Sequence, residues 1–248
     1  MSTASISVPL ARPERRPNRL AERAFFAGMA VLILATVLFG FAKTYFLAGM
    51  VAAPLPNKLI HIHGAAFTLW ILLLITQIAL VSAKQVRIHK QLGLWGFGLA
   101  VAMVVLGLFA AVNALRRGVA VNGLDAQTFF IIPLTAIFLF ATIIAFSYRT
   151  RRNPAAHKRL VIIATIALLD AAVGRWPINA LQVHPPLQDV VLLGFLLLVA
   201  AYDLISLHKI HRATIWASAL CIVVHLVRVP IGQSAPWHAF AARLAARG

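Results

Sequence analysis

Seven long apolar runs constrain this chain more than any other feature of its sequence. Each run holds about 20 residues, the length that an α-helix needs to cross the hydrocarbon core of a bilayer. Hydrophobic residues make up 61% of the 248 positions, against roughly 45–50% in soluble domains. We therefore predict an all-α polytopic membrane protein, a bundle of seven transmembrane helices. The runs cover residues 26–47, 59–82, 92–114, 128–148, 158–178, 188–207 and 213–231.

The placement of the basic residues predicts the orientation of this bundle. Most of the 23 Lys and Arg residues lie before the first run or in the short gaps after the second, fourth and sixth runs. The positive-inside rule therefore predicts a cytoplasmic N-terminus and an outside C-terminus, with Arg116 and Arg117 as the main exceptions. In a soluble protein a net charge of +17 would suggest nucleic acid, but these charges follow the membrane topology and no nucleic-acid surface is expected.

The runs divide the chain into three parts. We expect a disordered basic cytoplasmic tail over residues 1–25, a transmembrane domain over 26–231 and a short extracytoplasmic segment over 232–248. After a first anchor helix, the remaining six should pair as three hairpins. The inner turns of these hairpins are alike, since each holds a histidine followed by a basic residue, as at His89, His157 and His211, which suggests a weak internal repeat.

Polar side chains inside the predicted spans are the candidates for function. An ionisable group at the centre of a membrane helix costs at least ~2.5 kcal/mol, so its presence needs a reason. In the second run His63, Trp70 and Gln77 recur every seven residues and share one helix face, whereas His61 points to another. The seventh run carries a polar stripe that should face the bundle interior. The stripe consists of Thr214, Ser218, Cys221, His225 and Arg228.

Two of these histidines, His63 and His225, should lie at a similar depth near the outer side. Two imidazoles with cations nearby could hold a b-type haem, with the histidines as axial ligands and the propionates paired to Lys or Arg. The cations expected at this depth are Lys43, Arg175 and Arg228. The alternative is a hydrogen-bonded network around Asp170 and Arg175 that only fastens helices together.

The inner side offers a second set of histidines. His89, His157 and His211 each open a span beside Lys or Arg, where basic side chains commonly reach towards lipid headgroups. A helix N-terminus disfavours the charged imidazolium, and neutral imidazole is the form that binds metal. A ligand role for His89 and His157 therefore stays open, and Asp203 is expected to pair with Lys209 or Arg212.

Several short motifs resemble a known family. The residues concerned are Leu59, His61–Gly64, Trp70, Gln77, Arg87–Gly93, His157–Leu160, Arg175, Tyr202–Asp203, Arg228 and Trp237. They are similar to an uncharacterised family of bacterial multi-pass membrane proteins, which implies a bacterial cytoplasmic membrane. More loosely, His89 and the residues after it resemble cytochrome b561-type proteins, whose four core helices hold two b haems by paired histidines. In that arrangement an inner pair would be His89 with His157.

Three functions are compatible with these features. The first is a membrane haem protein that transfers electrons, with a quinone or a membrane redox protein as partner. The second is a zinc-dependent intramembrane hydrolase of the ceramidase type, using His61, His63 and His225 as ligands and Asp170 as base. The third is a transporter or an assembly subunit of a membrane complex, and for transport Pro133 is the interior proline that could interrupt a helix.

Overall fold

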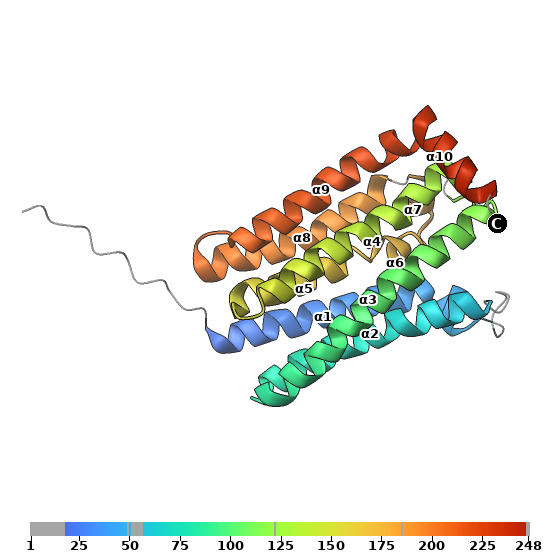
Figure 1. The fold of residues 1–248 in the computed structure, drawn as a ribbon. Helices are drawn as coiled ribbons and strands as arrows, with labels where there is room; N and C mark the ends of the chain where they lie inside the picture. The colour runs from blue at the N-terminus through green and yellow to red at the C-terminus, as the bar shows by residue number, and fades with distance from the viewer. Residues whose placement is uncertain (1–17, 49, 51–56, 122, 185, 247–248) are drawn as a thin grey trace, which may run out of the picture.

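The computed structural model describes residues 18–48, 50, 57–121, 123–184 and 186–246, and this part of the chain is helical without a strand (Figure 1). Six of its helices are long and apolar enough to cross a membrane, so the predicted class, an all-α polytopic membrane protein, is confirmed. The elements are α1 (Arg19–Phe41), η1 (Ala42–Phe46), α2 (Lys58–Ser82), α3 (Val86–Arg116), α4 (Ala126–Arg149), α5 (Pro154–Ile166), α6 (Asp170–Val173), α7 (Asn179–Val183), α8 (Pro186–Leu207), α9 (Arg212–Gly232) and α10 (Ala235–Ala246).

The helix starts are fixed by polar caps. The side chains of Asn18, Asn57, Asp125 and Asn153 accept hydrogen bonds from the first free amides of α1, α2, α4 and α5. The cap at Asn18 starts α1 at Arg19, so the predicted tail of residues 1–25 is wrong for 19–25, which are helical. Residues 1–17 of that tail lie outside the described residues.

The fifth predicted span, residues 158–178, is interrupted in the structure. Helix α5 ends at Ile166, and the amides of Leu168 and Leu169 bond carbonyls three residues back, as in a 3₁₀ turn, before α6 begins at Asp170. Helix α6 ends at Val173, and Pro177 cannot continue a helix because it lacks an amide proton. The prediction of one helix over 158–178 is therefore wrong, although α5 and α6 together lead from one end of the bundle to the other (Figure 1). Pro133, by contrast, leaves α4 continuous.

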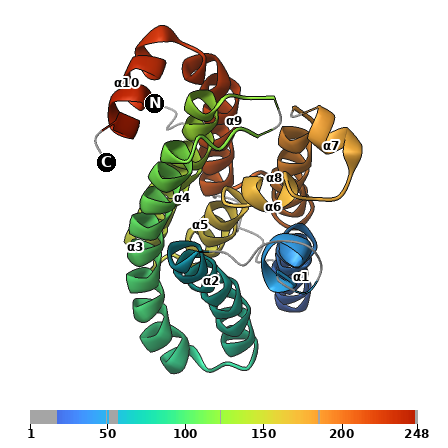
Figure 2. The same ribbon diagram turned by 90° about the vertical axis from the view of Figure 1, so that its right-hand side faces the viewer.

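Helix α5 forms the centre of the bundle, with α1, α4, α8 and α9 packed around it (Figure 2). Its last turns, residues 162–166, are 0–1% exposed. The helices around it bury a smaller share of their residues and expose the rest, as expected for helices that meet lipid. Trp70 of α2 donates a hydrogen bond from its indole to the Thr165 hydroxyl at 3.1 Å, which ties α2 to this centre.

The bundle has two distinct ends. The N-terminal end is where α1 begins and where the turns after α2, α4 and α8 lie, and the C-terminal end carries α6, α7 and α10 (Figure 1). Helix α3 packs extensively against both α2 and α4. The predicted division into three hairpins therefore stays a prediction.

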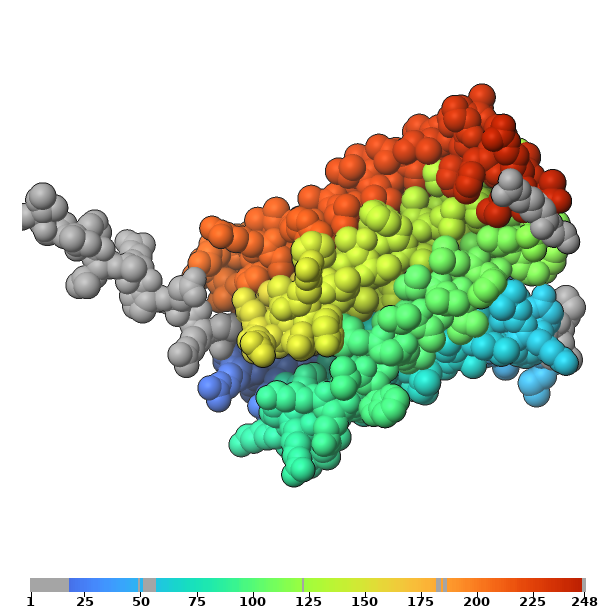
Figure 3. Space-filling view, in the orientation of Figure 1, coloured from blue at the N-terminus to red at the C-terminus, as the bar shows by residue number. Residues whose placement is uncertain are grey.

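The segment after the last span, residues 232–248, is not simply an extended tail. Its helix α10 lies across the C-terminal end, against α3, α4 and α9 (Figure 3). The Trp237 indole donates to the Gln127 carbonyl at 2.7 Å, and Ala241 is fully buried.

Asp125, at the start of α4, accepts hydrogen bonds from the hydroxyl and amide of Thr128, which hold the pKa of its carboxyl below the usual value.

The close approach of α1 to α6 generates the first prediction. A methyl group at Gly40 would lie 2.2 Å from the Ala172 carbonyl oxygen, so the backbones of the two helices would have to separate. We expect Gly40→Ala to destabilise the protein by about 1–3 kcal/mol, measured as a lower midpoint of thermal unfolding in detergent. Gly28→Ala on the same helix is the matched control, because no atom lies within 4 Å of its added carbon. Equal midpoints for the two variants would contradict this packing.

Candidate functional site

The first polar cluster lies near the C-terminal end and is called here the Arg228 network. Arg228 of α9 donates to the Asp170 carboxylate at 2.5 and 3.2 Å and to Asp189 at 2.7 Å, and so joins α6, α8 and α9. The predicted stripe on α9 does face inward, since Thr214, Cys221 and Arg228 are buried. The network around Asp170 was anticipated, but its cation is Arg228 and not Arg175.

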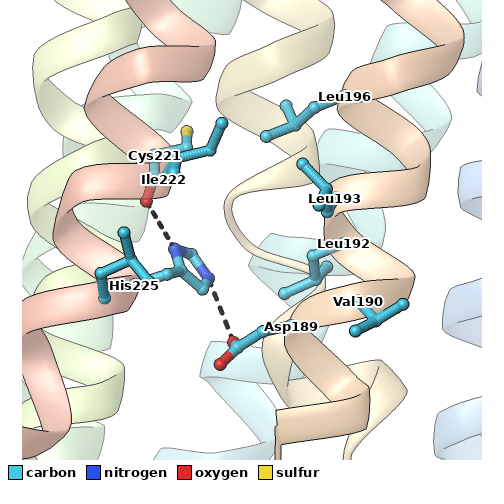
Figure 4. A pocket seen from close by; sticks show the side chains of 9 residues that line it. Asp189, Val190, Leu192, Leu193, Leu196, Cys221, Ile222 and His225 are labelled. Carbon is cyan, nitrogen blue, oxygen red and sulfur yellow. Dashed lines mark hydrogen bonds and ion pairs between the residues drawn. The ribbon is translucent and has the colours of Figure 1, made fainter.

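His225 completes this network. Its Nδ1 lies 2.8 Å from the Cys221 carbonyl oxygen, which only accepts hydrogen bonds, so Nδ1 carries the proton (Figure 4). Its Nε2 faces the carboxylates of Asp170 and Asp189 at 3.4 and 3.9 Å, and it makes no hydrogen bond in the structure.

The carboxylates and the imidazole of this network are also possible metal donors. One ligand atom each of Asp170, Asp189 and His225 lies within 4.8 Å of the others. However, Arg228 already bonds both carboxylates, and a cation placed between them would have to displace its guanidinium. The present geometry is that of an ion-pair network and not of a metal site.

The structure does not bring His63 and His225 together. Helices α2 and α9 lie on opposite sides of α5 (Figures 1 and 2). His63 packs against Phe67 with ring centroids 4.3 Å apart, and its Nδ1 is buried without a hydrogen bond. His61 is exposed on another face of α2, as its spacing predicted, and lies beside Tyr45. The proposed outer haem pair and the zinc set of His61, His63 and His225 therefore have no common centre.

The cations predicted to pair with propionates do not gather at one place: Arg175 acts electrostatically on His63 of α2, whereas Arg228 lies on α9. Arg228 is bonded to two carboxylates, as described above. Arg175 donates to the Ala171 carbonyl and lies over the Phe41 ring, 5.0 Å from its centre. Lys43 is exposed in η1. The sequence could place these residues at one depth, but it could not show which side of the bundle each one faces.

The second polar cluster lies near the N-terminal end and contains the His89–His157 pair. These residues lie on α3 and α5, and their ring centroids are 6.5 Å apart with the ring planes at 82°. Nδ1 of His157 lies 3.1 Å from the Ser147 carbonyl and 2.9 Å from the Ser147 hydroxyl. Nδ1 of His89 is buried without a hydrogen bond, next to the backbone of Gln77.

Gln77 lies beside this pair, on the face of α2 that it was predicted to share with His63 and Trp70. Its amide nitrogen lies next to Gly93 of α3, one turn beyond His89, where an added methyl would be 3.3 Å away. Its amide oxygen is buried without a hydrogen bond. Trp70 lies deeper, in the hydrophobic core, edge-on to Phe140. Trp70 is therefore a packing residue, and Gln77 is a neighbour of the histidine pair.

A third cluster, called here the Arg159 network, was not predicted. Arg159 of α5 donates from Nε and Nη2 to the Asp203 carboxylate of α8 at 2.7 and 2.5 Å. The other carboxylate oxygen accepts from the Thr214 hydroxyl and the His211 amide. Asp203 therefore pairs with Arg159, a partner that was not predicted. The detectable signal was that Arg159 and Asp203 both lie inside predicted spans, on helices that can approach each other.

His211 caps the start of α9 in its neutral form. Its Nδ1 accepts a hydrogen bond from the Ala213 amide at 3.0 Å, so this nitrogen carries no proton. Partial burial and the positive charge of Arg159 hold the pKa of His211 below its usual value. His211 is thus a helix cap, whereas His89 and His157 form a pair.

Comparison with known proteins brought no match to a family model, to a curated protein or to a solved structure. The function is therefore argued from the clusters themselves.

The Arg159 network generates the second prediction. The side chains of Arg159 and Asp203 are 1% and 0% exposed, so Asp203→Ala leaves a buried charge without its partner. We expect a loss of about 3–5 kcal/mol in unfolding free energy, measured by denaturant titration in detergent. Asp125→Ala, which removes an exposed helix cap, should cost about 1 kcal/mol. The double variant Arg159→Met with Asp203→Leu should recover most of the loss. An equal cost for Asp203→Ala and Asp125→Ala would contradict the assignment.

Proposed function

We propose that this protein is a b-type haem protein of the membrane, which binds the haem through His89 and His157 and transfers electrons. The observation that carries the proposal is the His89–His157 pair. Two imidazoles that bind one metal from opposite sides, with metal–nitrogen bonds of ~2 Å, have ring centroids about 6 Å apart. The centroids here are 6.5 Å apart, close to that value.

The second support is the protonation state of His157. A backbone carbonyl only accepts hydrogen bonds, so the contact with the Ser147 carbonyl places the proton of His157 on Nδ1. Nε2 then carries the lone pair that a metal requires. A second hydrogen bond that orients a ligating histidine in this way is the usual arrangement in metal sites. The Nδ1 of His89 is buried and makes no hydrogen bond in the structure, and the Gln77 backbone lies close to this side chain.

The residues around the His89–His157 pair have distinct tasks in this proposal. A bound haem would supply an iron that accepts and releases one electron. Ser147 holds the His157 ring in place, Phe97 of α3 lies beside it with centroids 6.3 Å apart, and Gln77 covers Gly93. The zinc alternative finds no such pairing, since His61, His63 and His225 lie apart.

The third prediction concerns the spectrum of the purified protein. With haem supplied during expression, we expect a Soret band and an α band that sharpens on reduction with dithionite. His89→Ala and His157→Ala should each weaken haem binding at least tenfold, because one axial ligand is lost. His157→Met, which keeps a ligand atom, should retain haem with a raised reduction potential.

The controls separate this site from the other histidines. His184→Ala removes an exposed imidazole at the C-terminal end and should leave the spectrum unchanged. His225→Ala should also retain the haem, with folding of each variant checked by its unfolding midpoint. A wild-type protein without haem, stoichiometric zinc in its place, or loss of haem in His225→Ala but not in His157→Ala would overturn the proposal.

We further propose that the chain crosses the bacterial cytoplasmic membrane seven times, with its N-terminus inside. The six long helices and the α5–α6 path alternate in direction along the bundle, which supports an odd number of crossings (Figure 1). The excess of basic residues at the N-terminal end supports the orientation. The haem site would then lie on the cytoplasmic side.

The fourth prediction tests this topology by cysteine labelling in intact cells. In a Cys221→Ser background, Ala120→Cys lies in the exposed turn after α3 and should react with a membrane-impermeant maleimide. Gln85→Cys lies in the exposed turn after α2 and should react only after the cells are opened. The reverse pattern would overturn the orientation, and labelling of both positions in intact cells would overturn the alternation.

A further inference from the structure

A groove runs between α8 and α9 and ends at the Arg228 network. Aliphatic side chains from both helices form its walls, with Leu192, Leu193 and Leu196 on one side and Ile222 and Leu226 on the other (Figure 4). His225 and Asp189 lie at its polar end. Its volume of about 160 Å³ corresponds to roughly five water molecules in the liquid. The groove therefore has room for one ring-sized group.

The groove opens towards lipid and not towards water. Both of its helices are long and apolar enough to cross the membrane, and the residues at its rim are exposed, with Leu226 at 71% and Val190 at 60%. A compound that enters here has to be dissolved in the bilayer. Its apolar part can remain along the exposed faces of α8 and α9 while its polar part reaches His225.

The charges at the polar end select the kind of head group. The Arg228 guanidinium is already bonded to both carboxylates, which compensate its positive charge, and its Nε is buried. An anion would also meet the negative charge of Asp189, whose side chain is 40% exposed. A neutral head group meets neither obstacle.

The same end presents two groups that can form hydrogen bonds with a ligand. Asp189 can accept a hydrogen bond from a hydroxyl group. The Cys221 carbonyl holds the Nδ1 proton of His225, and Nε2 makes no hydrogen bond in the structure, so Nε2 can also accept one from a hydroxyl group. A head group whose ring carries hydroxyl groups can be bound here through its oxygen.

We infer that this groove binds the head group of a membrane quinone or quinol. The aliphatic walls contact the ring, His225 and Asp189 bind its oxygen, and the tail lies in the surrounding lipid. This inference does not depend on the haem proposal, because the groove and the His89–His157 pair lie at different ends of the bundle and are tested by different measurements.

The fifth prediction is the labelling of this groove by a photoreactive quinone. The full chain in phosphatidylcholine nanodiscs is irradiated with an azido-quinone of short tail, and the labelled peptides are identified by mass spectrometry. We expect label within residues 186–232, at least tenfold reduced by excess unlabelled quinone. Diacylglycerol and phosphatidylglycerol at the same concentration should leave the label unchanged.

Two matched variants locate the site. Leu193→Trp places an indole in the groove from a half-exposed position and should reduce the labelling at least tenfold. Leu198→Trp adds the same side chain on α8 outside the groove and should have no effect. His225→Gln, which keeps a polar side chain of similar length, should weaken binding about tenfold, and unfolding midpoints verify that each variant is folded.

The outcomes are decisive in either direction. Label in the expected peptides that Leu193→Trp removes and Leu198→Trp preserves supports the quinone site. Label elsewhere, equal labelling of the two tryptophan variants, or equally strong competition by diacylglycerol would overturn it. Because no haem is needed for labelling, the quinone site can be supported even where the purified protein contains no haem and the haem proposal fails.

Discussion

Two buried ion pairs between arginine and aspartate hold the helices of this protein together. Arg159 with Asp203 joins α5 to α8 near the N-terminal end, and Arg228 with Asp170 joins α9 to α6 near the other. Lipid is as apolar as the side chains facing it, so helices in a bilayer gain little from hydrophobic contact with each other. A charge buried without a partner is costly there. These pairs therefore specify which helices are neighbours, and the site geometry follows from that choice.

The central position of α5 is the main consequence. Because α5 and α6 are bound at both ends to α8 and α9, the interrupted path lies inside the bundle, shielded from lipid. A 3₁₀ turn at mid-membrane is tolerated where protein surrounds it. The start of α5 then carries His157 to His89 of α3, and the start of α6 carries Asp170 to His225. Both candidate sites thus depend on the same central element.

Much of the architecture could be predicted from the sequence, because lipid imposes a simple rule on every spanning segment. The helix bounds at α2, α4 and α9 lie within two residues of the predicted runs. The inward faces of α2 and α9 were also correct, since helical periodicity determines which residues share a side. Periodicity does not say which helix a face meets. For this reason the sequence predicted His63 and His225 as a pair at one depth, although α5 lies between their helices.

The sequence by itself determined that this is a membrane protein of long helices, which residues face inward, and that His89 and His157 lie near helix starts at the same end of the bundle. Hydropathy and helical period suffice for this, because they depend only on residues close in the chain. The tertiary structure alone decided the ion-pair partners, Arg159 for Asp203 and Arg228 for Asp170. It also decided that the fifth span is interrupted. Such choices depend on the lateral arrangement of helices, which is set by the simultaneous pairing of charges on segments far apart in sequence.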